Sequence, residues 1–324
     1  MEYRQLGNSG LQVSEIGLGT NNFGHHDRPP FHLRSADAAV VINRALDEGI
    51  NLIDTANSYG EGLSEEFIGL ALKGKRHQAV IATKVSSRIG EGPNMAGNSR
   101  KHIFDEVDKS LLRLGTDYID LYQIHWFDPN TSIEETLRAM DDLVSQGKVR
   151  YVGCSNFRAW QVCEAMWTSR SVGITSFVSV QPCYNMLDRA IEVDLLPFCE
   201  KYEVGVLPYF PLAHGFLTGK YRRDQLPPKG TRLAADSKGL LIEEHFDLLD
   251  QLEKFAMDRG HTILELAFAW LLARPTVSSV IAGATSGKQV AANAASVEWR
   301  ISDEEFAQVN ELLDGAQVKV LLDR

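Results

Sequence analysis

The sequence predicts an α/β protein of the (β/α)8 TIM-barrel class, folded as a single domain over residues 1–324, and three observations favour that class. The chain has 324 residues, a length that suits one such barrel. Eight short apolar runs rich in β-forming residues recur along it, most of them about 30 to 40 residues apart, which is the length of one strand and one helix. The segments between these runs show the periodicity of helices.

The expected strands follow one another in chain order. They cover residues 16–20, 51–56, 79–84, 120–125, 149–155, 176–181, 205–211 and 278–284. Helices are expected between them, for example at 35–49, 100–115 and 132–147, each opened by a serine or closed by a glycine, which are residues that cap helix ends. Residues 212–260 interrupt the pattern between the seventh and eighth strands, so we expect an insertion there with its own helix around 242–258.

A doubly wound sheet is the alternative fold, and its dinucleotide fingerprint is incomplete here. That fingerprint is G-x-G-x-x-G between the first strand and helix, whereas Gly17 and Gly19 are followed by Asn22. A P-loop is missing as well, because Gly215 and Gly219 enclose only three residues. A ligand that carries phosphate therefore needs another binding element.

Composition excludes several classes of protein. The formal net charge is −10, from 33 basic and 43 acidic side chains, whereas nucleic acids and anionic membranes require a basic surface. The N-terminus lacks the basic and apolar regions of a signal peptide, and no apolar run is long enough to cross a bilayer. The four cysteines form no C-x-x-C pair, as expected for reduced thiols. We therefore expect a cytoplasmic protein, and the oligomeric state stays open.

Four polar residues stand at the ends of three consecutive expected strands. Asp54 lies at the end of the second strand and Tyr59 in the loop after it, while Lys84 ends the third strand and His125 the fourth. Active sites of (β/α)8 barrels lie at the C-terminal ends of the strands, and neighbouring strands are about 4.8 Å apart. These four side chains are therefore expected to share one pocket.

The four residue types suggest proton transfer to a carbonyl oxygen. A nearby ammonium group, from Lys84, is expected to lower the pKa of Tyr59 and make it a general acid at neutral pH. Asp54 is expected to pair with Lys84, because a charged lysine at a barrel mouth is costly without a partner. His125 is then expected to hydrogen-bond the substrate oxygen and orient it.

Each residue also has a structural interpretation. Asp54 can cap a loop or helix, Lys84 can pair with a carboxylate, and His125 can be a hydrogen-bonded core residue. Their convergence on three successive strand ends favours the catalytic interpretation. No metal is expected, because His25 and His26 are adjacent and no cluster of His, Asp and Glu has the spacing of metal ligands.

These residues belong to longer segments which together resemble the aldo-keto reductase family from about residue 3 to residue 313. The segments are NLIDTANSYGEGLSEE, IATK, SLLRLGTDYIDLYQIHWFD, GKVRYVGCSNF, QPCYN, PLAHGFLTGKY and GATSGKQVAANAAS. The resemblance implies that Asp54, Tyr59, Lys84 and His125 form a catalytic tetrad with Tyr59 as proton donor. It also implies NADP-dependent reduction of a small-molecule aldehyde or ketone to an alcohol.

The resemblance further implies a nicotinamide cofactor in extended form across the barrel mouth. The family's carboxamide-binding residues are matched by Ser155, Asn156 and Gln181. Tyr209 matches the aromatic residue that stacks on the nicotinamide ring, and Gly19 and Thr20 match positions near the nicotinamide ribose. The family's pyrophosphate lining is matched here by Phe210, Pro211, Leu212 and Gly215. The residues that bind the adenosine end are matched by Gly283, Ala284, Thr285, Gln289 and Asn293. Two more residues, Asp54 and Lys220, are also assigned to the cofactor.

Cofactor preference and substrate are less constrained by the resemblance. Gly283, Ala284 and Gln289 stand where some branches carry a Lys-Ser pair and an Arg near the 2′-phosphate, so a modest NADPH preference is expected from Thr285 and Lys288. The expected substrate contacts are Phe23, Tyr59, His125 and Trp126.

Two other functions stay open. One is a redox-sensing accessory subunit that binds NADP tightly with negligible turnover, as in the family's potassium-channel β-subunit branch. The other is a Schiff-base lyase with Lys84 as nucleophile, since barrels host many aldolases.

Overall fold

Eight parallel strands form the central sheet of the computed structural model, which describes residues 1–24 and 32–316. Their order is β10-β3-β4-β5-β6-β7-β8-β9. The strands are β3 (Ile16–Gly19), β4 (Leu52–Asp54), β5 (Val80–Val85), β6 (Ile119–Ile124), β7 (Val149–Ser155), β8 (Ser179–Gln181), β9 (Gly205–Val206) and β10 (Val280–Gly283). Each of the eight expected runs contributes one strand, so the predicted strand order is confirmed.

The barrel closes between β9 and β10 through single bridges instead of a continuous ladder. Val206 pairs with Val277 and Tyr209 with Ile281, and the Ile281 N–H donates to the Pro208 carbonyl at 2.8 Å. The strand expected over 205–211 is therefore only two residues long. Pro208 lacks the N–H that a ladder needs, and this accounts for the early end of β9. The predicted (β/α)8 barrel is confirmed.

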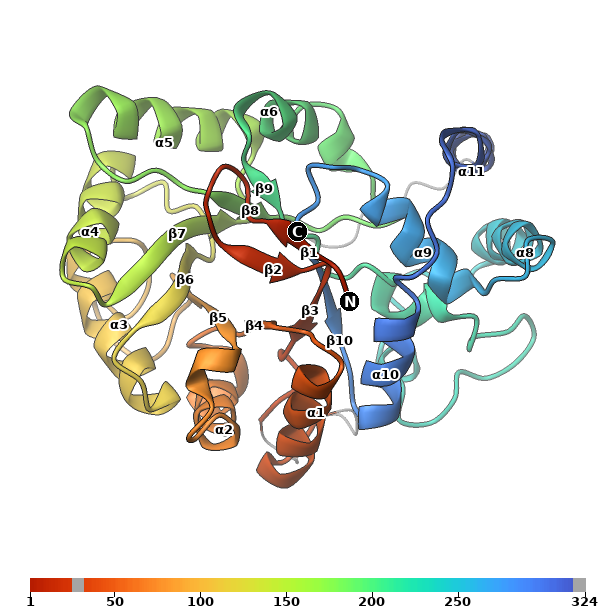
Figure 1. Cartoon of the computed structure of the whole chain (residues 1–324), viewed down its shortest axis with the longest axis horizontal. Coiled ribbons are helices and arrows are strands. Elements are labelled where there is room, and N and C mark those ends of the chain that lie inside the picture. Colours follow the sequence, from red (N-terminus) through yellow and green to blue (C-terminus); the bar gives the residue numbers. More distant parts are fainter. Residues whose placement is uncertain (25–31, 317–324) are drawn as a thin grey trace.

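Helices surround the barrel (Figure 1). They are α1 (Ser35–Asp47), α2 (Leu63–Ala71), α3 (Arg100–Leu114), α4 (Ile133–Ser145), α5 (Ala159–Val172), α6 (Leu195–Tyr202), α9 (Ile263–Leu272), α10 (Gly287–Ala295) and α11 (Asp303–Gly315). The hydroxyls of Ser99 and Ser132 accept N–H bonds at the starts of α3 and α4, as expected for cap residues. No helix in the described part of the chain is both long and apolar enough to cross a membrane.

The expected insertion between the seventh and eighth strands is present. It begins with a short 3-10 turn, η4 (Ala213–Thr218), and contains α7 (Arg232–Ala235) and α8 (Glu243–Met257). The helix predicted around 242–258 is thus confirmed as α8. The insertion carries α7 toward the barrel mouth, where its first residue contacts the loop after β3.

An N-terminal hairpin, absent from the sequence-based prediction, covers the opposite end of the barrel. Its strands are β1 (Tyr3–Gln5) and β2 (Gln12–Ser14), which lie across the centre of the view in Figure 1. Leu6 and Val13 of this hairpin are buried in a cluster with barrel residues such as Leu52 and Leu121. The hairpin thereby seals the N-terminal face with apolar contacts, and the C-terminal face is left for a site.

Candidate active site

Lys84 lies at the centre of the site that the sequence predicts. Its Nζ donates to Asp54 Oδ2 at 2.8 Å, to the Thr55 carbonyl at 2.8 Å and to the Tyr59 hydroxyl at 3.3 Å. The Lys84 side chain has 0% of its surface exposed. A buried ammonium with three donor hydrogens is thus fully hydrogen-bonded, and two of its partners are the predicted ones.

The segment after β4 is rich in glycine because the tight turn that carries Tyr59 requires it. Tyr59 opens the short 3-10 helix η1 (Tyr59–Gly62), in which Gly60, Glu61 and Gly62 all have positive φ, at 56°, 60° and 97°. A Cβ on Gly60 would lie 2.7 Å from the Phe23 carbonyl oxygen, so a side chain does not fit there. This tight turn folds the phenol back over Lys84.

The pKa of Tyr59 is raised, not lowered as expected from its lysine neighbour. Burial of the phenol has the largest effect and raises the pKa, while Lys84 lowers it and Asp54 raises it. For Lys84, burial opposes the charge, but Asp54 and Tyr59 outweigh that effect and raise the lysine pKa. Tyr59 is therefore protonated and Lys84 charged at neutral pH, which is the state that a proton donor requires.

Asp54 has a second set of partners inside the barrel. Gln181 Nε2 donates to Asp54 Oδ1 at 2.8 Å, and Gln123 Nε2 lies 3.5 Å from the same oxygen. Gln123 is fully buried and was not predicted as a site residue. Its position two residues before His125 was the available signal, because alternate residues of a strand face the same side.

His125 is a neutral imidazole at the edge of the site. Only 9% of it is exposed, and burial, followed by the charge of Lys84, lowers its pKa to about 3. Its ring contacts Tyr59 edge-on, with centroids 5.8 Å apart, and lies nearly parallel to Trp126 at 5.6 Å. The geometry brings all four residues of the predicted tetrad together.

The residues assigned to the carboxamide form a network of their own. Ser155 donates to the Gln181 carbonyl at 2.8 Å, and Asn156 Nδ2 donates to the His125 carbonyl at 3.0 Å. The Tyr209 hydroxyl donates to Asn156 Oδ1 at 2.8 Å. Gln181 Nε2 donates to Asp54, and the side-chain oxygen Oε1 of Gln181 can accept a hydrogen bond from a ligand.

Two cationic side chains stand beside the predicted pyrophosphate lining. Gly215 has φ 91°, and a Cβ there would lie 2.8 Å from Lys220 Nζ. The guanidinium of Arg232 lies 5.4 Å from the Phe210 ring centroid and donates to Asn21 Oδ1 at 3.2 Å. Arg232 was not predicted, because nothing in the insertion sequence marks it apart from its charge. Burial lowers the pKa of both cations, and Arg232 lowers that of Lys220 further, so an anion between them would be favourable.

The predicted adenosine end lies at the start of α10. Ser286 caps this helix, and the Thr285 N–H and hydroxyl both donate to Gln289 Oε1, at 2.7 and 3.0 Å. Thr285 is therefore committed to Gln289, whereas Lys288 is exposed and makes no ion pair within the described residues. Asn22 Nδ2 donates to the Ala284 carbonyl at 2.9 Å and ties this loop to the one after β3. Asn293 is buried on the same helix.

Three predicted contacts lie deeper than expected. Phe23 has 1% of its surface exposed and packs in the hydrophobic core, so it offers no wall to a substrate. Gly19 and Thr20 are also buried, and the Thr20 hydroxyl donates to the Asp54 carbonyl at 2.8 Å. Trp126, in contrast, is 43% exposed beside His125 and is available to a ligand.

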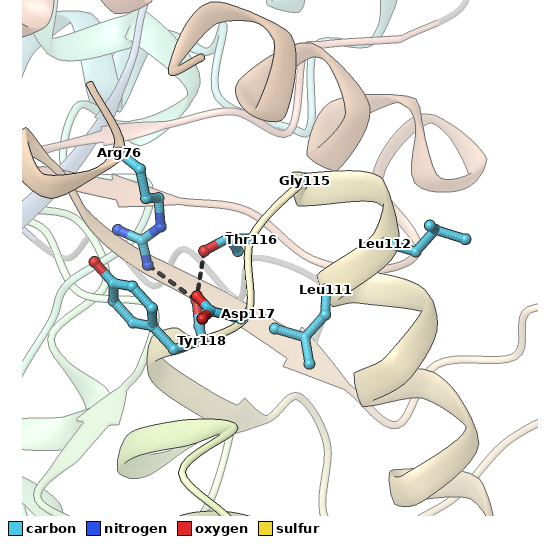
Figure 2. Close-up of a pocket in the computed structure, with 7 residues that line it drawn as sticks. All are labelled: Arg76, Leu111, Leu112, Gly115, Thr116, Asp117 and Tyr118. Atoms are coloured by element: carbon cyan, nitrogen blue, oxygen red, sulfur yellow. Dashed lines mark hydrogen bonds between the residues drawn. The ribbon is translucent and has the colours of Figure 1, made fainter. Parts of the chain in front are cut away.

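No metal cluster is present among the residues that the structure describes, and His25 and His26 lie outside them. A hollow lined by Arg76, Leu111 and Tyr118 lies at the start of β6 (Figure 2). Arg76 donates there to the Tyr118 carbonyl at 3.1 Å. This is the N-terminal face of the barrel, where residues serve stability and not chemistry, so we assign it no function.

The fold and the four converging side chains define a barrel with a site at its C-terminal face, and comparison with known proteins gives the family. The sequence model described as "Aldo/keto reductase family" matches residues 15–314. Aldo-keto reductase YhdN of Bacillus subtilis is 36% identical, over 97% of this chain and 94% of its own length. The chain belongs to the aldo/keto reductase family, which is a family of oxidoreductases.

Other relatives have different names. Versiconal hemiacetal acetate reductase of Aspergillus parasiticus is 32% identical over 96% of both chains. A probable voltage-gated potassium channel subunit beta of Oryza sativa is 34% identical over 90% of both. The match therefore extends to proteins that are named as enzymes and to proteins that are named as channel subunits.

Proposed function

We propose that this protein reduces aldehydes or ketones to alcohols with NADPH, and that Tyr59 is the general acid. The observation that carries this proposal is the position of Lys84 Nζ, which bonds both Asp54 and the Tyr59 hydroxyl within a site that also holds His125. A protonated phenol beside an ammonium and a neutral imidazole is suited to give a proton to a carbonyl oxygen.

The residues at the mouth fit a nicotinamide dinucleotide. Gly283 is exposed at the end of β10 and carries no side chain that would block an extended ligand. Lys220 and Arg232 provide positive charge for the pyrophosphate, and the start of α10 offers backbone N–H groups for a further phosphate. When bound, the cofactor supplies the hydride.

The side chains of the tetrad have distinct parts in this proposal. Tyr59 donates its proton to the substrate oxygen, and Lys84 then stabilises the phenolate through their 3.3 Å contact. Asp54 keeps Lys84 charged and in place. His125, neutral at any pH well above 3, orients the same oxygen with a ring N–H. Trp126 lines the entry for the rest of the substrate.

A Schiff-base lyase is disfavoured by the charge state of Lys84. A lysine nucleophile must be deprotonated, and sites that use one lower its pKa. Here Asp54 and Tyr59 raise it. The amine is therefore held as an ammonium and cannot attack a carbonyl.

An accessory subunit without turnover is the second candidate. It is favoured by relatives that are named as potassium channel subunits, of which one from Arabidopsis thaliana is 35% identical over 92% of this chain. This function predicts cofactor binding without useful rates on any substrate. Measurement of turnover on carbonyl compounds separates it from the first proposal.

The test offers the protein a panel of aliphatic and aromatic aldehydes and ketones in the presence of a metal chelator. Reduction of each compound is measured as the loss of NADPH absorbance. We expect turnover on at least one class, and Tyr59→Phe should lower it by about 10² to 10⁴-fold while the Kd for NADPH stays nearly unchanged. Absence of turnover together with tight NADPH binding would favour the accessory subunit. Near-normal turnover in Tyr59→Phe would show that another group is the acid.

A further inference from the structure

Directly after β5 the backbone adopts a rare conformation, which places Ser86 and Ser87 against the residues that follow β6. Ser86 has φ 140°, a conformation that residues other than glycine rarely adopt. Its hydroxyl donates to the Trp126 carbonyl at 3.0 Å, and its carbonyl accepts the Gly97 N–H at 2.8 Å. These two bonds hold the strained residue in place and direct the chain over His125.

The next residue, Ser87, meets the imidazole of His125. Its Oγ lies 3.4 Å from His125 Nδ1, a long hydrogen bond of the kind that often tightens when a ligand binds. The other ring nitrogen, Nε2, has no hydrogen-bond partner among the described residues, and it is not among the fully buried polar atoms that lack one. Nε2 is therefore accessible to a ligand.

The position of the His125 ring is fixed on other sides as well. Its backbone N–H donates to the Val85 carbonyl at 2.8 Å, and its carbonyl accepts from Asn156 Nδ2 at 3.0 Å. The nearly parallel ring of Trp126, inclined by 19°, restricts rotation of the imidazole. With the ring plane held in this way, the remaining variable is which nitrogen carries the proton.

A neutral imidazole has one N–H, and the hydrogen bond at one nitrogen determines the state of the other. If Ser87 donates to Nδ1, the proton is on Nε2, and Nε2 can donate to a substrate oxygen. If Nδ1 carries the proton, Nε2 is an acceptor and repels that oxygen.

We propose that Ser87 is a positioning residue that selects the Nε2–H tautomer of His125, and that the strained backbone of Ser86 directs Ser87 to Nδ1. The tautomer itself is a property of the free protein. Its value for catalysis rests on the proposed carbonyl reduction, in which Nε2–H orients the oxygen that Tyr59 protonates.

The experiment is ¹⁵N NMR of protein labelled at histidine, at neutral pH and without ligand. The chain has nine histidines, and the His125 signals are those that disappear in His125→Asn. In the wild-type protein we expect His125 Nδ1 to have the ¹⁵N chemical shift of an unprotonated ring nitrogen and His125 Nε2 to have that of a protonated one. Ser87→Ala should move both shifts toward a mixture of tautomers, and Ser87→Thr, which keeps the hydroxyl, should restore them.

Kinetics provide the second measurement. Ser87→Ala should lower kcat about 3- to 10-fold, with the Kd for NADPH unchanged, and Ser87→Thr should recover most of the loss. Ser169→Ala is the matched control, since this buried serine of the outer helix α5 donates to the Thr175 carbonyl, away from His125.

The two measurements separate the possible failures. A wild-type spectrum with the proton on Nδ1, or tautomers that do not change in Ser87→Ala, would overturn the role of Ser87 whatever the rates. The expected spectra without turnover on any carbonyl would leave the tautomer assignment standing and count against the proposed function instead.

Discussion

Lys84 carries a positive charge although its side chain has no exposed surface. Burial of this charge costs free energy, which the neighbouring residues offset. A buried ammonium is stable only when its hydrogens are all bonded and an opposite charge is near. Asp54, Thr55 and Tyr59 supply these partners. The pairing of Asp54 with Lys84 was predictable because the two residues end adjacent strands. The hydrogen bond to the Thr55 carbonyl was not predictable, because every residue has a backbone carbonyl and the sequence does not mark this one.

The direction of the Tyr59 pKa shift was not predictable from the sequence. The neighbouring ammonium lowers the pKa as expected, but the extent of burial depends on how the turn at Gly60 folds the phenol inward. Burial disfavours the phenolate more than Lys84 favours it. The proposal that Tyr59 is the acid thus rests on residue types near strand ends, whereas the direction of its pKa shift follows from packing.

The dependence of reduction on pH tests these assignments. A general acid works in its protonated form, so a raised Tyr59 pKa extends the active range upward. His125, with a pKa of about 3, stays neutral throughout. We expect kcat/KM for reduction to be flat between about pH 5 and 8 and to fall only above the ordinary tyrosine value near 10. An inflection between about pH 6 and 7 would instead indicate that a histidine of ordinary pKa titrates during turnover.

Among the helices and strands, regular strand–helix units were predictable and irregular connections were not. The periodic runs correspond to β3 through β10, and the helix of the insertion appears as α8 within one residue of the expected ends. The N-terminal hairpin was missed because its strands are only three residues long. Arg232 was missed because its approach to Asn21 joins segments 211 residues apart, which no local pattern records.

We infer the cofactor preference from the loop between β10 and α10. Thr285 is bonded to Gln289, so the free positive group for a 2′-phosphate is Lys288, beside the N-terminal end of the helix. We predict that NADPH binds about 10- to 100-fold more tightly than NADH, corresponding to about 1 to 3 kcal/mol of charge-assisted hydrogen bonding. Lys288→Ala should weaken NADPH binding much more than NADH binding, and added salt should narrow the difference.

Fluorescence titration of both cofactors measures this preference. Lys201→Ala is a matched control, because Lys201 is exposed near the C-terminal end of α6 and helices of a (β/α)8 barrel end on the face opposite the site. That variant should bind both cofactors as the wild type does. Equal wild-type affinities for NADPH and NADH would show that no 2′-phosphate site exists at Lys288.

For the whole molecule, the lowered pKa values of His125, which is buried, and His214, which is half-buried, make stability depend on acid pH. His125 has a pKa of about 3, and His214 in the insertion has a pKa lowered to about 4, by burial first and then by Arg232 and Lys238, with Asp236 acting in the opposite direction. The His214 ring lies against Phe210, with centroids 4.2 Å apart. Both histidines are thus neutral in the folded protein and take up protons on unfolding below about pH 6.5.

The sign of the effect follows from these two values. Each lowered pKa contributes stability that is complete above about pH 6.5 and declines as the pH falls toward the folded-state pKa. Between pH 7 and pH 5 we expect each histidine to remove about 1 to 2 kcal/mol from the free energy of unfolding. Urea unfolding at a series of pH values measures this loss. His214→Gln should reduce the slope, because glutamine does not titrate, while His125 and His102 keep the remainder. A free energy of unfolding that is constant from pH 7 to pH 5 would mean that both imidazoles are accessible to protons in the folded protein.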